Sequence, residues 1–293
     1  MQSKITKTLT DLGLTSEDSR ELFSERTRDK ENLPVWRDRL SGVLYINDYY
    51  VGEDEYLTSE YNKDLSVSIS SLNSEDQRNL DRRVAAYGHL GKNKDVCDFG
   101  CGAGLFIEAI KNQCSSVIGV ELQAQHISNL KQKGIHCVND IEKIDNDSID
   151  LIVSFHVIEH LPDPISTLKV LNKKLRSDGT LLVEVPHARD FLLSEMVNCR
   201  EFRDFTLWSQ HLILHTRESL QKFLEAGGFR VTQIDGVQRY PLSNHFGWLS
   251  SGRPGGHTGV LGELDNPSIT EEYEKALEMI DATDTIVAKA EKC

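Results

Sequence analysis

The stretch Val96-Cys-Asp-Phe-Gly-Cys-Gly-Ala-Gly-Leu-Phe-Ile107 decides the fold that we predict for this chain. It begins as a short apolar run, carries an acid at Asp98, and then places glycine at every second position (Gly100, Gly102 and Gly104). The apolar residues that follow recur at the spacing of one helix face. A strand, a glycine turn and a helix N-terminus together let the backbone approach a nucleotide-like ligand closely. We therefore predict a ligand-binding turn here, with a plain tight turn as the alternative.

The chain after this turn alternates between strand and helix patterns. The next predicted strands are 117–121, 135–138, 149–155, 180–185 and 229–235, with amphipathic segments between them. Such alternation implies a parallel sheet that binds ligands at the carboxyl ends of its strands. Polar residues fall at or near several of these ends: Asp98, Glu121, Asp140 and His156. Their coincidence predicts one ligand site along this edge.

The residues before the core form a separate segment, 1–72. We predict a polar helix capped at Thr15 and running to about Lys30, followed by a hairpin that turns at Ser41-Gly42. A cluster of tyrosines follows, which is typical of a packed aromatic seam: Tyr45, Tyr49, Tyr50, Tyr56 and Tyr61.

Two capped helices bracket the predicted core. A capping box at Ser74 begins a helix that ends at Gly91, and we interpret its arginines as a solvated face (Arg78, Arg82 and Arg83). A second box at Ser268 begins a terminal helix, which we interpret as a packing or homodimer helix. The predicted boundaries are therefore a lobe over 1–72, a core over 73–236, and a flap with a helix over 237–293.

Composition argues against several classes of protein. The 293 residues carry a formal net charge of −13, which disfavours a nucleic acid partner because such proteins usually present a basic surface. No apolar run approaches the roughly 20 residues of a membrane helix, and the N-terminus lacks the apolar core of a signal peptide. The six cysteines include no Cys-x-x-Cys pair, so we expect them to be reduced in a cytoplasmic protein.

The glycine turn with its preceding acid resembles motif I of the class I S-adenosylmethionine-dependent methyltransferases. The run Val157-Ile-Glu-His-Leu-Pro-Asp-Pro164 and the helix–glycine–strand ending near Phe229 are similar to the ubiquinone-biosynthesis O-methyltransferases. The resemblance covers about residues 75–236. It implies an α/β fold with a seven-stranded, mostly parallel sheet, helices on both faces, and a small α+β lobe before it. The lobe over 1–72 looks like the one that small-molecule methyltransferases often place over the methyl acceptor, so we expect it to cover the acceptor.

The resemblance also implies S-adenosylmethionine as the cofactor and assigns its contacts. Asp98 would hold the methionine end, the three glycines would pass under the ribose, and Asp140 would meet the adenine amino group unless it is a simple turn residue. Glu121 stands 21 residues after Gly100, where an acid accepts hydrogen bonds from both ribose hydroxyls. The remaining predicted cofactor residues are Phe99, Leu122, Ile141, Phe155 and His156.

Methyl transfer to a hydroxyl requires removal of a proton, and histidine suits that task near neutral pH. His160 and His211 are the candidate bases, because the segments that carry them converge over the sulfonium in this fold; a structural role is the alternative for each. The run His156-x-x-Glu159-His160 is also similar to the Glu-x-x-Glu-His metal motif of small-RNA ribose methyltransferases and some ubiquinone enzymes, with His211 or His215 as a further ligand. Because His156 replaces a glutamate of that motif, we favour a metal-free base over a divalent ion.

We expect O-methylation of a small polar metabolite, such as a sugar or sugar nucleotide in glycan or natural-product biosynthesis. The alternatives are a metal-assisted RNA ribose 2′-O-methyltransferase and a catalytically inactive, cofactor-binding partner subunit. Since the predicted cofactor residues all lie between 95 and 160, acceptor recognition is expected from the outer segments. The expected acceptor contacts are Arg239, Asn244, His245 and Trp248.

Overall fold

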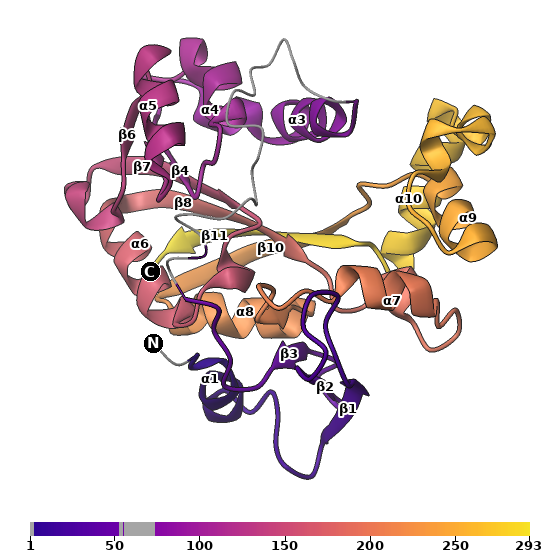
Figure 1. Cartoon of the computed structure of the whole chain (residues 1–293). Helices are drawn as coiled ribbons and strands as arrows, with labels where there is room; N and C mark the ends of the chain where they lie inside the picture. Colours follow the sequence, from indigo (N-terminus) through magenta and orange to yellow (C-terminus); the bar gives the residue numbers. More distant parts are fainter. Residues whose placement is uncertain (1–2, 53–54, 56–73) are drawn as a thin grey trace.

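The computed structural model of the chain describes residues 3–52, 55 and 74–293 (Figure 1). Its centre is a seven-stranded sheet in the order β10-β11-β8-β7-β4-β5-β6. The strands are β4 (Asp95–Phe99), β5 (Ser116–Val120), β6 (His136–Val138), β7 (Ile149–Phe155), β8 (Leu175–Pro186), β10 (Phe229–Val237) and β11 (Thr285–Lys292). Within this sheet, β11 runs antiparallel to its neighbours β8 and β10, and the pairings of β4 to β8 are parallel. The predicted α/β fold with a mostly parallel sheet is confirmed.

Helices cover both faces of the sheet (Figure 1). One face carries α3 (Ser74–Tyr87), α4 (Leu105–Ile110) and α5 (Ala124–Gln132), and the other carries α6 (Pro164–Lys174) and α8 (Arg217–Ala226). Each face has its own apolar core, in which side chains such as Ile107 of α4 and Phe223 of α8 are fully buried. Within the described residues, no helix combines the length and the hydropathy needed to cross a membrane.

The strand β11 corrects the predicted domain boundary. We expected residues 237–293 to form a flap and a helix outside the core, but their last strand lies in the sheet between β8 and β10. Residues 285–288 are buried, and Ala288 pairs with Val183 of β8. The position of this strand depends on partners far away in the sequence, and its own short pattern, with lysines at 289 and 292, did not predict it.

Two helices precede β11. α9 (Leu242–Ser251) lies in the segment 238–257 that we expected to be an irregular flap, and α10 (Pro267–Met279) is the predicted terminal helix. The side chain of Asn266 caps α10 by accepting a hydrogen bond from the Ile269 amide, so the predicted cap at Ser268 is wrong. Proline follows the cap at the first helical position, where its missing N–H costs no hydrogen bond.

The first half of the N-terminal lobe differs from the prediction. The polar helix expected from Thr15 to Lys30 is wrong. The chain instead forms α1 (Ile5–Asp11), β1 (Arg20–Ser24), β2 (Val35–Asp38) and β3 (Leu44–Ile46). The Thr15 hydroxyl caps no helix there and bonds the Tyr45 hydroxyl at 3.1 Å in a buried position. Because β1 pairs with β2, strand pairing overrides the capping pattern.

The predicted hairpin is confirmed. β2 pairs antiparallel with β3, and Gly42 in the turn has a φ of +75°, which glycine adopts most readily. Tyr45 is fully buried, as a packed aromatic seam requires. Tyr56 and Tyr61 of the same predicted cluster lie outside the described residues.

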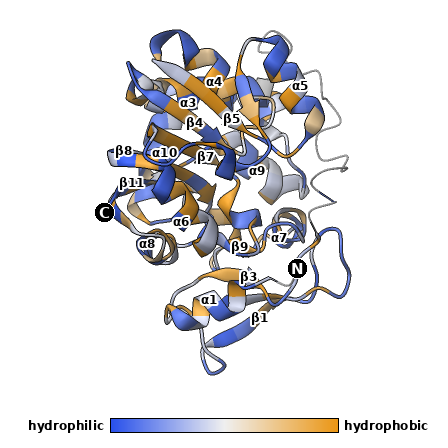
Figure 2. Cartoon of the chain, turned by 90° about the vertical axis from the view of Figure 1, so that its left-hand side faces the viewer, coloured by the Kyte–Doolittle hydropathy of each residue, from blue (hydrophilic) through white to orange (hydrophobic). Residues whose placement is uncertain are grey.

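A fourth strand fixes the lobe to the core. β9 (Ile213–Leu214) pairs with β3, which gives the sheet order β1-β2-β3-β9. The Arg28 amide donates to the Leu207 carbonyl at 2.7 Å, and Asp29 accepts from the Ser209 amide at 3.0 Å. The lobe therefore lies against the segment that carries His211, at the opposite end of the molecule from α4 and α5 (Figure 2).

Candidate active site

The glycine turn after β4 has room for a ligand at one position. Gly100, Gly102 and Gly104 all have positive φ, at 75°, 52° and 69°. A Cβ would come within 2.4 Å of Val157 at Gly100 and within 2.3 Å of Leu130 at Gly104, so close packing requires glycine at both. At Gly102 a Cβ would meet nothing within 4 Å. The turn is thus held by its outer glycines and leaves open space beside the middle one, as a cofactor cradle requires.

Glu121 stands directly beside this turn. Its Oε2 accepts a hydrogen bond from the Gly102 amide at 2.9 Å, and its Oε1 accepts from the Gln123 amide at 2.9 Å. The neighbouring Leu122 is 47% exposed, an apolar surface that a bound adenosine would cover. These contacts fix the carboxylate at the end of β5, where a ribose acceptor was predicted.

Asp98 is buried at the end of β4. Burial raises the pKa of this carboxyl to about 7, the charge of Arg83 opposes that rise, and the charge of Glu121 adds to it. A cationic group beside Asp98 would favour its ionised form. The ammonium group of S-adenosylmethionine is such a cation, so the residue fits its predicted role.

The structure gives Asp140, Ile141 and Phe155 contacts within the protein. Asp140 is exposed and accepts from the Glu142 amide at 2.9 Å, which caps the short turn that contains the buried Ile141. The Phe155 ring packs edge-on against Phe106, with centroids 5.1 Å apart. The turn interpretation of Asp140 thus accounts for its contact, and its approach to adenine stays a prediction.

His156 lies between two buried carboxylates. Its Nδ1 is 3.2 Å from Oε1 of Glu159, and its Nε2 is 3.3 Å from Oε1 of Glu184 and 3.2 Å from Nη1 of Arg239. The residue has a φ of +57°, uncommon outside glycine, so the backbone holds an unfavourable conformation to place this ring. The imidazole therefore links the ends of β7 and β8, and its predicted contact with the cofactor stays untested.

Glu184 organises a charge cluster that the sequence interpretation missed. The side chain is fully buried on β8, with Arg82 at 2.9 Å and Arg83 at 2.6 Å. Burial opposes its ionisation, but Arg83, His156 and Arg82 hold the pKa well below its usual range. The solvated face predicted for Arg82 and Arg83 is therefore wrong. The available signal was one acid within the apolar run 181–185 of a buried strand.

His160 and His211 come together, as predicted. Their ring centroids are 4.9 Å apart, and ligand atoms of Glu159, His160 and His211 all lie within 4.8 Å of one another. The Gln210 carbonyl, 2.9 Å from Nδ1 of His160, can only accept, so Nδ1 carries the hydrogen and the lone pair of the ring is on Nε2. Burial lowers the pKa of His160 and lowers that of His211 to about 3, so both rings are neutral at neutral pH.

The same three side chains fit a divalent ion. Oε2 of Glu159 and Nδ1 of His211 are buried without a hydrogen-bond partner in the described part of the chain. One carboxylate and two neutral imidazoles form a common ligand set for transition metals. His215 bonds Ser219 at 3.0 Å and His156 bridges carboxylates, so neither belongs to this group. The objection based on His156 therefore does not apply to the arrangement found.

If Glu159, His160 and His211 hold a divalent ion, exhaustive chelation should lower methyl transfer by at least about tenfold, and the ion should restore it, because it would activate the hydroxyl. Affinity for the cofactor should not change, since its predicted residues lie elsewhere. Elemental analysis and rate measurements check this. Full transfer by metal-free protein would leave His160 as an ordinary base.

A cavity of about 580 Å³ opens beside these histidines. His156, His160 and His211 line part of its wall, and the predicted acceptor contacts Arg239, Asn244, His245 and Trp248 line another part. Three of the four use polar atoms to build that wall. Arg239 pairs with Asp284 at 3.3 Å, Asn244 accepts from the Gly255 amide at 3.1 Å, and Nδ1 of His245 is 2.5 Å from the Tyr273 hydroxyl. The segment 238–257 thus forms a structured side of the cavity.

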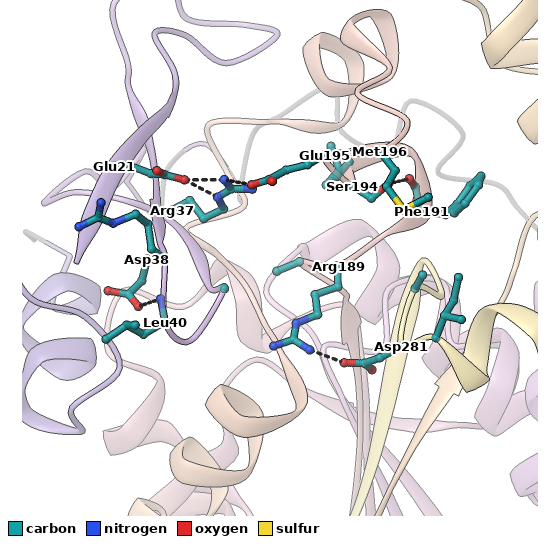
Figure 3. A pocket seen from close by; sticks show the side chains of 16 residues that line it. Glu21, Arg37, Asp38, Leu40, Arg189, Phe191, Ser194, Glu195, Met196 and Asp281 are labelled. Carbon is teal, nitrogen blue, oxygen red and sulfur yellow. Dashed lines mark hydrogen bonds and ion pairs between the residues drawn. The ribbon is translucent and has the colours of Figure 1, made fainter.

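A second cavity, of about 750 Å³, lies between the N-terminal hairpin and the segment 188–196 (Figure 3). Two of the arginines that line it are ion-paired: Arg37 with Glu21 and Glu195, and Arg189 with Asp281. The third, Arg39, donates a hydrogen bond to the Asp18 carbonyl. No residue predicted for the cofactor or for catalysis lines it. Although larger, it offers no group for methyl transfer.

The nucleotide-type turn, the carboxylate at Glu121 and the seven-stranded sheet define an S-adenosylmethionine-dependent methyltransferase. The chain belongs to the family described as "Methyltransferase domain", which it matches over residues 72–234. S-adenosylmethionine is therefore its cofactor and supplies a methyl group on a sulfonium. Asp98, the glycine turn and Glu121 are the residues that would hold it.

Several known proteins are similar to the chain. The ubiquinone biosynthesis O-methyltransferase of Coxiella burnetii is 29% identical over 169 residues, which cover 53% of this chain and 71% of that protein. The mitochondrial enzyme of the same name from Bos taurus is 25% identical, over 58% of this chain and 51% of that one.

Solved structures share the fold. A methyltransferase from Archaeoglobus fulgidus has a TM-score of 0.50 at 18% identity, over 75% of this chain and 95% of its own. The 1,6-didemethyltoxoflavin-N1-methyltransferase of Burkholderia thailandensis, solved with its substrate and S-adenosylhomocysteine, has a TM-score of 0.51 at 15% identity, over 85% and 94%. At these identities the likeness shows the fold alone.

Replacing Glu121 by alanine is expected to weaken S-adenosylmethionine binding by a few kcal/mol, about 100-fold, because the ribose loses a charged acceptor in a partly closed site. Isothermal calorimetry measures this directly. Glu218→Ala, at an exposed position of α8, is the matched control and should bind normally. Unchanged affinity in the Glu121 variant would remove the ribose assignment.

Proposed function

We propose that this methyltransferase modifies a hydroxyl oxygen of a small polar metabolite, such as a sugar or sugar nucleotide in glycan or natural-product biosynthesis. The observation that carries the proposal is the cavity of about 580 Å³ with Glu159, His160 and His211 at its wall and just behind it. A volume of this size suits a small molecule. The neutral imidazole of His160 at that place suits removal of a hydroxyl proton.

Other features support the same class of acceptor. The relatives from Coxiella burnetii and Bos taurus are named as O-methyltransferases. Trp208, Tyr240 and Trp248 line the cavity, so part of its wall is aromatic. The charge of −13 disfavours an RNA acceptor, which keeps the metal-assisted ribose methyltransferase as the second candidate.

The proposed chemistry follows from the contacts around His160. The Gln210 carbonyl fixes the tautomer, so that Nε2 can accept the proton of the hydroxyl. Glu159, 3.9 Å from this nitrogen, would stabilise the imidazolium that forms. If Glu159, His160 and His211 instead held a divalent ion, that ion would act as a Lewis acid on the same hydroxyl in place of the His160 base. The N-terminal lobe, held against residues 207–209, would help to exclude water.

The test is methyl transfer from labelled S-adenosylmethionine to sugars, sugar nucleotides, other small-metabolite fractions and RNA, with the labelled atom identified by NMR. Label on the oxygen of a small molecule supports the proposal. Label on RNA alone would favour the ribose methyltransferase, and label on nitrogen would place the reaction in another class. Cofactor binding without any transfer would indicate a catalytically inactive partner subunit.

We also propose a cytoplasmic location. The six cysteines are all free thiols, as in a reducing compartment. A fluorescent fusion expressed in the source cell tests this location.

A further inference from the structure

Within the described residues, one buried carboxyl in the cavity wall accepts a hydrogen bond from the protein on only one of its two oxygens. Asp190 lies between β8 and α7 (Arg200–Thr206), is 5% exposed, and lines the cavity. Its Oδ1 accepts from the Leu192 amide at 2.7 Å and caps a short turn. Among the described residues, the Leu192 amide is the donor found for this carboxyl. Oδ2 does not belong to the polar atoms that are both enclosed and without a hydrogen-bond partner. One oxygen is therefore structural, and the other is available to a ligand in the cavity.

The charge of Arg239 favours the ionised form of Asp190, but this arginine is already paired with another carboxylate. That carboxylate is Asp284, which also lines the cavity and whose Oδ1 lies 3.3 Å from Nε of Arg239. Nδ1 of His245 bonds the Tyr273 hydroxyl, and burial lowers the pKa of His245 to about 4, so this ring is neutral at neutral pH. Burial and the charge of Asp284 raise the pKa of Asp190 to about 8.

An acid at this position is unfavourable unless something in the cavity compensates it. Asparagine would cap the Leu192 amide equally well, because its side-chain oxygen is also an N-cap acceptor. The ionised form of a carboxyl buried beside a second carboxyl is costly without a cation, whereas a ligand cation would favour that form. The acid is therefore explained by a ligand and not by the turn that it caps.

We propose that the acceptor carries a protonated amine and that Asp190 binds it, so that the substrate class is a hydroxylated amine, such as an amino sugar. The inference rests on the proposed function in that the cavity is the acceptor site. The amine meets Oδ2 of Asp190, while the hydroxyl lies toward His160. Asp190 is thus a specificity-determining residue, separate from the groups that handle the proton.

Matched pairs of probes test this: D-glucosamine against D-glucose, and tyramine against 4-ethylphenol. Their binding to the full chain is measured by calorimetry with saturating S-adenosylhomocysteine, for the wild type, Asp190→Asn, Asp190→Ser and the exposed control Asp178→Asn. We expect each amine to bind the wild type about tenfold or more tightly than its neutral partner. This preference should disappear in both Asp190 variants and persist in the control.

Thermal unfolding adds a second readout, because both replacements keep an N-cap acceptor. The variants should melt no lower than the wild type. A clear loss of stability in both, an amine preference that survives in them, or a wild type that binds neither amine would each overturn the proposal. Binding needs no chemistry, so an intact amine preference without methyl transfer would refute the proposed function and leave this inference standing.

Discussion

Replacing His160 by alanine is expected to lower kcat by about 10²–10⁴-fold while affinity for S-adenosylmethionine stays nearly unchanged. The ring is buried, held by the Gln210 carbonyl at 2.9 Å, and presents Nε2 toward Glu159 and the cavity. The variant lacks either the base or one ligand of the ion, and either loss removes activation of the hydroxyl. Single-turnover rates with the acceptor, together with calorimetry for the cofactor, measure the two effects separately.

The double variant His160→Ala/His211→Ala sharpens this test. The two rings are 4.9 Å apart and belong to one group, so their effects on kcat should be far from additive. His89→Ala, at an exposed position, is the matched control and should transfer methyl normally. If both single variants keep the wild-type kcat, the proton is taken by another group, and the assignment of this histidine cluster to catalysis is wrong.

The central sheet could be predicted because its signals are local. The apolar runs of β4, β5 and β7 are bounded by turns, and the glycines at 100 and 104 leave room for Val157 and Leu130. The strand β11 could not be predicted in the same way, because its burial comes from β8 and β10 on either side. The expected helix after Thr15 failed for a similar reason, since pairing with β2 overrides a capping pattern.

The candidate site divides along the same line. The glycine turn and Glu121 follow from spacing, and the prediction that His160 and His211 converge followed from the resemblance. The cluster at Glu184 did not follow, because its arginines lie about 100 residues earlier on a helix whose polar face reads as solvated. An ion pair between two distant segments produces no periodic pattern in the sequence of either segment.

Glu184→Ala is expected to lower the free energy of unfolding by about 3–5 kcal/mol, because it removes the carboxylate that compensates Arg82, Arg83 and His156 beneath the surface. Urea unfolding measures the change, provided that the slope with urea is the same in both proteins. Glu218→Ala is the control, since this residue pairs with Lys222 at a largely exposed position and should cost roughly 1 kcal/mol or less.

The pH dependence of this difference gives a second test. The pKa of Glu184 is held well below 4.5 in the folded protein, so the unfolded chain binds the proton first as the pH falls. Its contribution is therefore fully present above about pH 4.5 and is lost progressively below it. The gap between wild type and variant should be constant from neutral pH to about 5 and then shrink on further acidification. A gap near zero at neutral pH would mean that the arginines find other partners, and Glu184 would then be dispensable for holding α3 against β8.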